Sequence, residues 1–263
     1  MSNPVLYMKY PVMTIAKFTI LEAIRNHLFL LILTGIVVIF LGNIFVAELS
    51  VTETRELQST VLGFVTRIYA VVVISLFVIT TMLREFHDKN VEMIISRDLP
   101  RYVYFLGKFT GFIMLVLVVS LLISIPLYFY SSPAQVGLWT VSLICELSII
   151  VTLCLLFLFT FENITAAFTA TAAFYILARC ISTIQLISQS PLAESNSIAQ
   201  VFITKFITFL SYILPHFDVF TQTDWLVYGT GKMEDINYIV MQTFIYIILL
   251  SAAALYDLYR KNF

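Results

Sequence analysis

Six apolar stretches, each about twenty residues or longer, constrain the fold of this chain more than any other feature. A bilayer core of about 30 Å needs about 20 helical residues to cross it, so each stretch predicts one transmembrane helix. Composition agrees, because 60% of the 263 residues are hydrophobic, against ~45–50% in soluble domains. We expect an all-α polytopic membrane protein, with residues 1–263 as one transmembrane domain and spans near residues 28–47, 61–83, 109–130, 138–161, 164–187 and 236–256.

Lysine and arginine are unevenly divided between the two sides that these spans define. Ten of them fall with the chain ends and with the loop between spans 2 and 3, and four fall on the other side. The positive-inside rule then predicts that both termini and this loop are cytoplasmic. The net charge of −1 gives no basic footprint for nucleic acid, so we expect no nucleic-acid partner.

Two segments outside the spans have a helical pattern. Residues 1–27 predict an amphipathic interfacial helix that Pro11 opens and that runs from Val12 to Asn26. It has Lys17, Glu22 and Arg25 on one side and Ile15, Phe18, Leu21 and Ile24 on the other. In the outer segment 188–237, residues 198–214 are apolar but are interrupted by polar side chains. We expect a re-entrant or interfacial helix there, between spans 5 and 6.

The densest charged run of the chain lies between spans 2 and 3, over residues 84–101. Read as a helix, it places Val91, Ile94 and Ile95 on one side. Glu85, Lys89 and Glu92 then line the other side, and Pro100 ends the helix. Periodicity alone is also compatible with a solvated interfacial loop that contains a helical turn.

The residues of this run and those after it resemble the cytoplasmic loop of ABC-2 type permeases, the membrane subunits of type V ABC exporters. The resemblance rests on Glu85, on Glu92-Met93-Ile94-Ile95-Ser96-Arg97, on Pro100-Arg101 and on Gly107-Lys108-x-x-Gly111. The branch annotated for multi-copper enzyme maturation, or nitrous-oxide-reductase accessory permeases, is the most similar. Lys89-Asn90-Val91 and the adjacent Pro100 and Arg101 depart from the usual pattern.

This resemblance implies a permease subunit in a bacterial inner membrane. Residues 84–101 would be the coupling helix that docks on a separate ATPase, and residues 1–27 the connecting helix that lines the receiving groove. Two copies of the permease would bind two ATPase subunits, which hold the ATP and Mg²⁺. ATP hydrolysis would drive export, or would transmit force to an outer partner protein. The implied docking residues are Glu85, Val91, Glu92, Ile94, Ile95, Arg97 and Arg101.

Motifs for chemistry within this chain are missing. Gly107-Lys108 and Gly231-Lys232 lack the remaining residues of a Walker A loop, so we expect no ATP hydrolysis by this chain and no cofactor in it. The histidines are scattered, and the three cysteines lie in apolar stretches, where inert buried thiols are expected. We therefore predict a protein that is not an enzyme by itself. The alternatives are an intramembrane hydrolase and a scaffold subunit that transports nothing.

Two charged residues fall well inside predicted spans. Glu146 and Arg179 each lie eight positions from the outer end of their span, or about 12 Å deep. Because an unpaired charge at that depth is costly, their equal depth predicts a partnership. It could form a polar patch on a translocation path or a buried structural pair, or each residue could face water. Arg67, nearer the outer end of span 2, is expected to extend outward to the interface. Lys108, within the Gly107-x-x-x-Gly111 pair, argues against helix dimerisation there.

Overall fold

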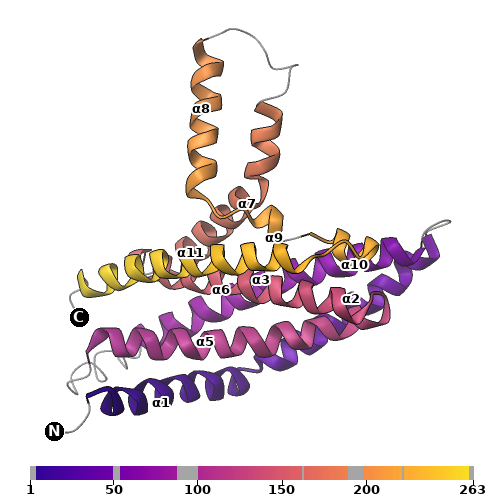
Figure 1. Cartoon of the computed structure of the whole chain (residues 1–263). Helices are drawn as coiled ribbons and strands as arrows, with labels where there is room; N and C mark the ends of the chain where they lie inside the picture. The colour runs from indigo at the N-terminus through magenta and orange to yellow at the C-terminus, as the bar shows by residue number, and fades with distance from the viewer. Residues whose placement is uncertain are drawn as a thin grey trace.

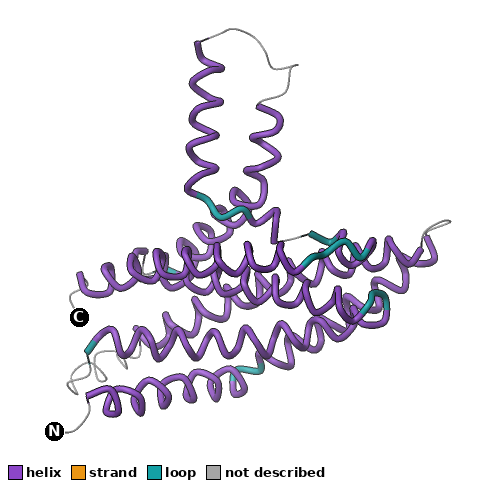
Figure 2. The backbone as a smooth tube through the Cα atoms, viewed as in Figure 1, coloured by secondary structure: helices purple, strands orange, loops and turns teal. Residues whose placement is uncertain are grey.

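The computed structural model describes residues 4–49, 54–87, 100–161, 163–188, 198–220 and 222–260. Every regular element in these ranges is a helix, and short loops join them (Figures 1 and 2). The helices in chain order are α1 (Pro4–Arg25), α2 (Leu28–Leu49), α3 (Thr54–His87), α5 (Arg101–Ser124), the 3-10 helix η1 (Ile125–Phe129), α6 (Pro133–Phe161), α7 (Ile164–Ser188), α8 (Ile198–Ile213), α9 (Phe217–Phe220), α10 (Asp224–Tyr228) and α11 (Met233–Arg260).

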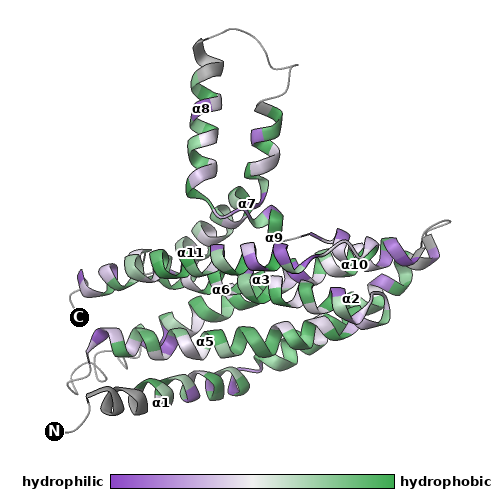
Figure 3. Cartoon of the chain, viewed as in Figure 1, coloured by the Kyte–Doolittle hydropathy of each residue, from purple (hydrophilic) through white to green (hydrophobic). Residues whose placement is uncertain are grey.

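Six of these helices are long and apolar enough to cross a membrane. They are α2, α3, α5 with η1, α6, α7 and α11, as the sequence predicted. Hydrophobic residues dominate the middle of the long helices (Figure 3). Pro126 explains the change to a tighter helix at the end of span 3, because proline cannot continue the α-helical hydrogen bonding. The all-α polytopic fold class is therefore confirmed.

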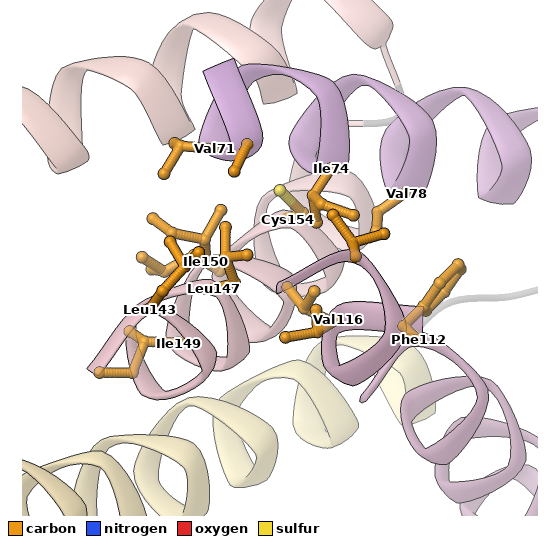
Figure 4. Packing of buried hydrophobic residues seen from close by; sticks show 14 of the residues in the cluster. Val71, Ile74, Val78, Phe112, Val116, Leu143, Leu147, Ile149, Ile150 and Cys154 are labelled. Carbon is orange, nitrogen blue, oxygen red and sulfur yellow. The ribbon is translucent and has the colours of Figure 1, made fainter. Parts of the chain in front are cut away.

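Helix α6 forms the centre of the bundle, with α3, α5, α7 and α11 packed around it. In the most apolar stretch of α6, 78% of the residues are buried, whereas in that of the peripheral α2 only 11% are buried. Figure 4 shows the core at this point: Val71, Ile74 and Val78 of α3 and Phe112 and Val116 of α5 meet Leu143, Leu147, Ile149, Ile150 and Cys154 of α6. A helix that is apolar on all sides must be surrounded, and α6 is surrounded by protein.

Helix α1 lies along α5 in very close contact. A Cβ atom added at Gly107 would come within 2.8 Å of Ile15 Cβ, and one added at Gly111 would come within 2.8 Å of Thr19 Cβ. The two glycines thus provide the contact surface for the N-terminal helix within this chain. The predicted start at Val12 was wrong, because α1 already begins at Pro4.

The face of α1 that is buried also differs from the one that its large apolar residues suggest. Ala16, Thr19 and Ala23 are buried, whereas Phe18 and Ile24 are exposed by 65% and 57%. Small side chains allow the close approach to α5, and the large apolar ones remain at the surface. The helix is thus amphipathic with its apolar face still exposed, as an interfacial helix requires.

Helix α8 confirms that a helix lies between spans 5 and 6, and its position as re-entrant or interfacial stays a prediction. Together with the later part of α7, it projects from the bundle as a hairpin (Figure 1). A hydrogen bond from Ser211 Oγ to Gln185 Oε1, 2.9 Å long, joins the two helices. The short helices α9 and α10 then lead back across the bundle to α11.

Candidate functional site

Four side chains from three helices form a buried polar cluster near the chain ends, which we call the lysine cluster: Glu22 of α1, Glu85 of α3, and Tyr104 and Lys108 of α5. Lys108 Nζ donates a hydrogen bond to Glu85 Oε1, and Tyr104 Oη donates to the other oxygen at 2.7 Å. Glu22 Oε2 lies 3.9 Å from Lys108 Nζ. The Lys108 side chain is only 5% exposed, so its charge depends on these carboxylates.

The lysine cluster carries one more negative than positive charge. Lys108 Nζ is closer to the Glu85 carboxylate than to the Glu22 carboxylate. Burial raises the pKa of the Glu22 carboxyl above its ordinary value, Lys108 partly opposes the rise, and the neighbouring Glu85 adds to it. The charged form of Glu22 is therefore less stabilised by its surroundings than it would be in water.

A groove of about 660 Å³ opens directly beside this cluster. Its lining comes from the later part of α1, the turn after it and the end of α3: Phe18, Leu21, Glu22, Arg25, Asn26, Arg84 and Glu85. Arg84 Nη1 donates to Asn26 Oδ1 at 3.2 Å, which ties the turn after α1 to α3. This turn is sharp enough to place His27 in the left-handed region, at φ 56°.

The predicted docking residues fall into two groups. Val91, Glu92, Ile94, Ile95 and Arg97 lie outside the described residues, so their role stays a prediction. Glu85 and Arg101 are described, and both have partners within the chain. Glu85 belongs to the lysine cluster, and Arg101 Nη1 donates to the carbonyls of Leu258 and Tyr259, 2.8 Å and 3.1 Å away, in the last turn of α11. The start of α5 and the end of α11 therefore meet at this end of the bundle.

A second cluster, which we call the arginine cluster, lies further along the same bundle: Arg67 of α3, Glu146 of α6, and Tyr175 and Arg179 of α7. Arg67 Nη1 approaches Glu146 Oε2 to 2.6 Å, and both side chains are fully buried. The guanidinium also donates to the Phe220 carbonyl at 2.7 Å and lies 4.8 Å from the centre of the Trp139 ring. Ser142 donates to the same carbonyl, which fixes α9 against α6.

The partnership predicted between Glu146 and Arg179 is replaced by an indirect link. Tyr175 Oη donates to Glu146 Oε1 at 2.9 Å, and Arg179 Nη1 donates to Tyr175 Oη at 2.7 Å. The cation in direct contact with Glu146 is Arg67, so the expectation that Arg67 extends outward was wrong. Its helix faces α6 at this level, where Arg67 Nη1 donates to a carboxylate and to a backbone carbonyl.

Neither cluster has the composition of a metal centre or of a nucleophilic site. Within the described ranges no group of three or more His, Cys, Asp or Glu side chains could hold a metal ion. Cys145 and Cys154 are buried as expected, but Cys180 is exposed, which corrects the expectation of a buried thiol there. Among the described residues, both clusters are arrangements of paired charges that join helices.

Sequence reasoning missed Glu22, Lys108 and Arg67 as members of buried clusters. The signal for Lys108 was present, because a lysine flanked by two small residues in an apolar helix must lie close to whatever packs on those glycines. For Arg67, the nearby apolar sequence gave no indication of its partner 79 positions away.

No protein-family model matches this chain, and no curated protein matches it either.

Proposed function

We propose that this protein is the permease subunit of an ABC-2 type exporter, which works as two copies bound to two copies of a soluble ATPase. The observation that supports this proposal most directly is the position of the lysine cluster. It connects α1 to the end of α3 and to the start of α5, the two helices that flank residues 88–99. Those residues carry most of the sequence resemblance to a coupling helix.

This arrangement would allow a displacement of residues 88–99 to move three helices together. Glu85 lies two positions before the end of α3, and Lys108 lies in the second turn of α5. Their ion pair makes the two helix ends one mechanical unit, and the packing of α1 on Gly107 and Gly111 adds the N-terminal helix. An ATPase that pushed on this unit would act on helices that continue through the whole bundle.

The apolar side of the predicted coupling helix is the part that tests the proposal. Burying Val91, Ile94 and Ile95 would contribute about 1.5 kcal/mol or more each, before the costs of association. We expect Ile94→Asp to release the ATPase when the protein is purified in mild detergent from its own membranes. Permease-stimulated ATP hydrolysis should be lost in the same preparation.

A matched control adds the same charge to the opposite side of the predicted helix. Ser96 lies on the polar side of the predicted helix, away from Val91, Ile94 and Ile95, so Ser96→Asp leaves the apolar contact intact and should retain more ATPase than Ile94→Asp does. Wild-type protein that purifies without any ATPase would contradict the proposal and would favour a scaffold subunit. Equal retention by Ile94→Asp and Ser96→Asp would show that this segment is not the docking helix.

Orientation gives an independent test. In a Cys180→Ser background, where the remaining Cys145 and Cys154 are buried, a cysteine introduced at Lys89 should react with an impermeant maleimide only from the cytoplasm. A cysteine at Lys232, which is exposed in the loop before α11, should react only from the outside. The reverse pattern would place residues 88–99 where no soluble ATPase can reach them.

A further inference from the structure

An apolar groove of about 450 Å³ runs along the surface between α3 and α7. Ligand pockets in proteins commonly enclose ~300–1,000 Å³, so this groove is large enough for a small molecule. Most of its lining is aliphatic or aromatic, and the residues that define its length include Phe64, Ile68 and Val72 of α3 and Phe168, Ile176 and Arg179 of α7.

Nearly all polar groups along the groove already have partners. Ser75 Oγ donates to the Val72 carbonyl at 3.0 Å, and Thr171 Oγ1 donates to the Ala167 carbonyl at 2.8 Å. The Tyr175 hydroxyl donates to Glu146 and accepts from Arg179. A ligand in this groove would therefore meet hydrocarbon along its length and a single strong polar group, the Arg179 guanidinium.

Among the described residues, Arg179 is the cation of this region that is not in contact with a carboxylate. Its carboxylate neighbour in the cluster, Glu146, is in direct contact with Arg67 instead. Within the part of the chain that the structure describes, no carboxylate lies within 4.0 Å of the Arg179 guanidinium. A guanidinium has five N–H donors, and Arg179 uses one of them on Tyr175. Because Arg179 lines the groove, its positive charge is within reach of a ligand there and favours an acidic ligand group.

The charge lies at one end of the groove. Arg179 is 5.1 Å from the centre of the Phe64 ring, and Phe64 is the lining residue nearest the start of α3. From Phe64 to Ser75 the groove follows α3 for eleven positions, or about 16 Å at the rise of an α-helix. Half of a bilayer hydrocarbon core is about 15 Å, so the apolar length matches one leaflet.

We propose that this groove binds an anionic lipid, with its acidic head on the Arg179 guanidinium and one hydrocarbon tail between α3 and α7. An anionic head supplies Arg179 with a counterion, and the tail covers the apolar residues of both helices. A zwitterionic head would bring its own cation to the same arginine and would be held less well. Binding requires neither ATP nor an ATPase, so the proposal stands apart from the proposed exporter function.

Cys180 provides the readout, because it lines the groove beside Arg179 and is exposed, whereas Cys145 and Cys154 are buried. The test measures the rate at which uncharged N-ethylmaleimide alkylates Cys180 in the full-length protein in nanodiscs. We expect phosphatidylglycerol, added to discs of phosphatidylcholine, to slow this reaction roughly tenfold at about ten times its Kd. Discs of phosphatidylcholine alone should give no such protection.

Two variants and a control decide the mechanism. Arg179→Gln should abolish the protection by phosphatidylglycerol, judged as a ratio of rates within that variant. Ala172→Trp, which fills the groove and keeps the charge, should abolish it as well, so the test does not depend on one variant folding. Lys205→Gln, which removes an exposed cation on α8, should retain it. Equal protection by both lipids, no protection, or protection that survives Arg179→Gln would each overturn the proposal.

Discussion

The two buried clusters are built on the same plan but have opposite net charge. In each, a carboxylate accepts a hydrogen bond from a tyrosine on one oxygen and from a cation on the other: Glu85 from Tyr104 and Lys108, and Glu146 from Tyr175 and Arg67. The fourth member differs. Glu22 gives the lysine cluster an extra negative charge, and Arg179 gives the arginine cluster an extra positive charge.

In each cluster, one carboxylate and one cation form an ion pair that holds helices together. The fourth charged side chain is outside this pair and remains available to a ligand or a partner. In the lysine cluster the tyrosine, carboxylate and cation join α3 to α5, and in the arginine cluster they join α3, α6 and α7, with α9 held through the Phe220 carbonyl. The fourth side chain stands outside this closest ion pair: Glu22 lies 3.9 Å from Lys108, and Arg179 contacts Tyr175 instead of the carboxylate. Each fourth side chain also borders a surface groove, together with one other member of its cluster. Buried charge in this bundle thus has a structural part and a part that can meet a ligand or a partner.

Helix α3 contributes to both clusters. Arg67 and Glu85 are 18 positions apart, or about 27 Å along the helix. This separation approaches the ~30 Å thickness of a bilayer core. Between them, the face of α3 that meets α5 and α6 is apolar and buried. The two clusters are therefore separated along α3 by nearly the thickness of one apolar layer.

The largest effect is expected from Glu146→Gln, which leaves two cations without a carboxylate. Removal of one partner from a buried ion pair typically costs ~3–5 kcal/mol, and both Arg67 and Glu146 are fully buried. Thermal and denaturant unfolding in detergent would measure the loss. The equivalent change in the other cluster, Glu85→Gln, should cost clearly less, because Glu22 remains beside Lys108. Equal losses of stability in Glu146→Gln and Glu85→Gln would show that the second carboxylate, Glu22, does not compensate for the loss of Glu85.

A double-mutant cycle sharpens this result. The energies of Glu146→Gln and Arg67→Gln should be strongly non-additive, with a coupling of about 2 kcal/mol or more, because these atoms lie 2.6 Å apart. The cycle of Glu146→Gln with Arg179→Gln should show a smaller coupling, since Tyr175 lies between them. A larger coupling with Arg179 than with Arg67 would contradict the described geometry.

Lys108→Met is expected to have the next largest effect, of about 2 kcal/mol at neutral pH, because it leaves Glu85 and Glu22 facing each other without their shared cation. Glu85 is 15% exposed and can be partly hydrated, so the loss should be smaller than for Glu146→Gln. Stability should partly return at acidic pH, because the Glu22 carboxyl, whose pKa burial raises, then binds a proton. Arg179→Gln, which removes the extra cation from the other cluster, should change stability much less than Lys108→Met.

Disrupting the close packing of α1 on α5 is expected to reduce stability somewhat less than removing the Lys108 charge. Gly111→Ala would place a Cβ 2.8 Å from Thr19 Cβ and 3.1 Å from the Ala16 backbone, so overpacking should cost about 1 kcal/mol or more. It should also loosen α1 and thereby expose Lys108, which hydrogen exchange would detect. Gly42→Ala is the control, because that Cβ would meet nothing within 4 Å and alanine favours the helix. A loss at Gly42 equal to that at Gly111 would exclude packing as the cause.

Hydrophobic length was enough to predict the six spans from the sequence. The spans, the outer helix α8 and the break at Pro126 follow from local signals that a single segment carries. The partners in the clusters could not be predicted in the same way. Equal depth suggested Glu146 and Arg179, but depth does not specify which face of a helix meets which neighbour. The packing of α1 against Gly107 and Gly111 could not be predicted either, because it joins two helices that are distant in sequence.

The smallest effect, and the one that best separates the fourth side chain from the structural pair, is expected at Glu22. Because burial raises the pKa of its carboxyl above the ordinary value of 4.5, the native state binds this proton more tightly than the unfolded chain does. The unfolding free energy should therefore fall as pH rises from about 4.5 through the raised pKa. Glu22→Gln should remove this decline and leave stability at pH 7 within ~1 kcal/mol of wild type, or slightly above it.

Unfolding curves recorded between pH 4.5 and 8 would measure this pH dependence. The control is Glu56→Gln, which removes an exposed carboxylate at the start of α3. A clear loss of stability in Glu22→Gln at pH 7 would mean that Glu22 is a structural partner of Lys108 equal to Glu85, and the contrast between the paired and the available charge would not hold at this end of the bundle.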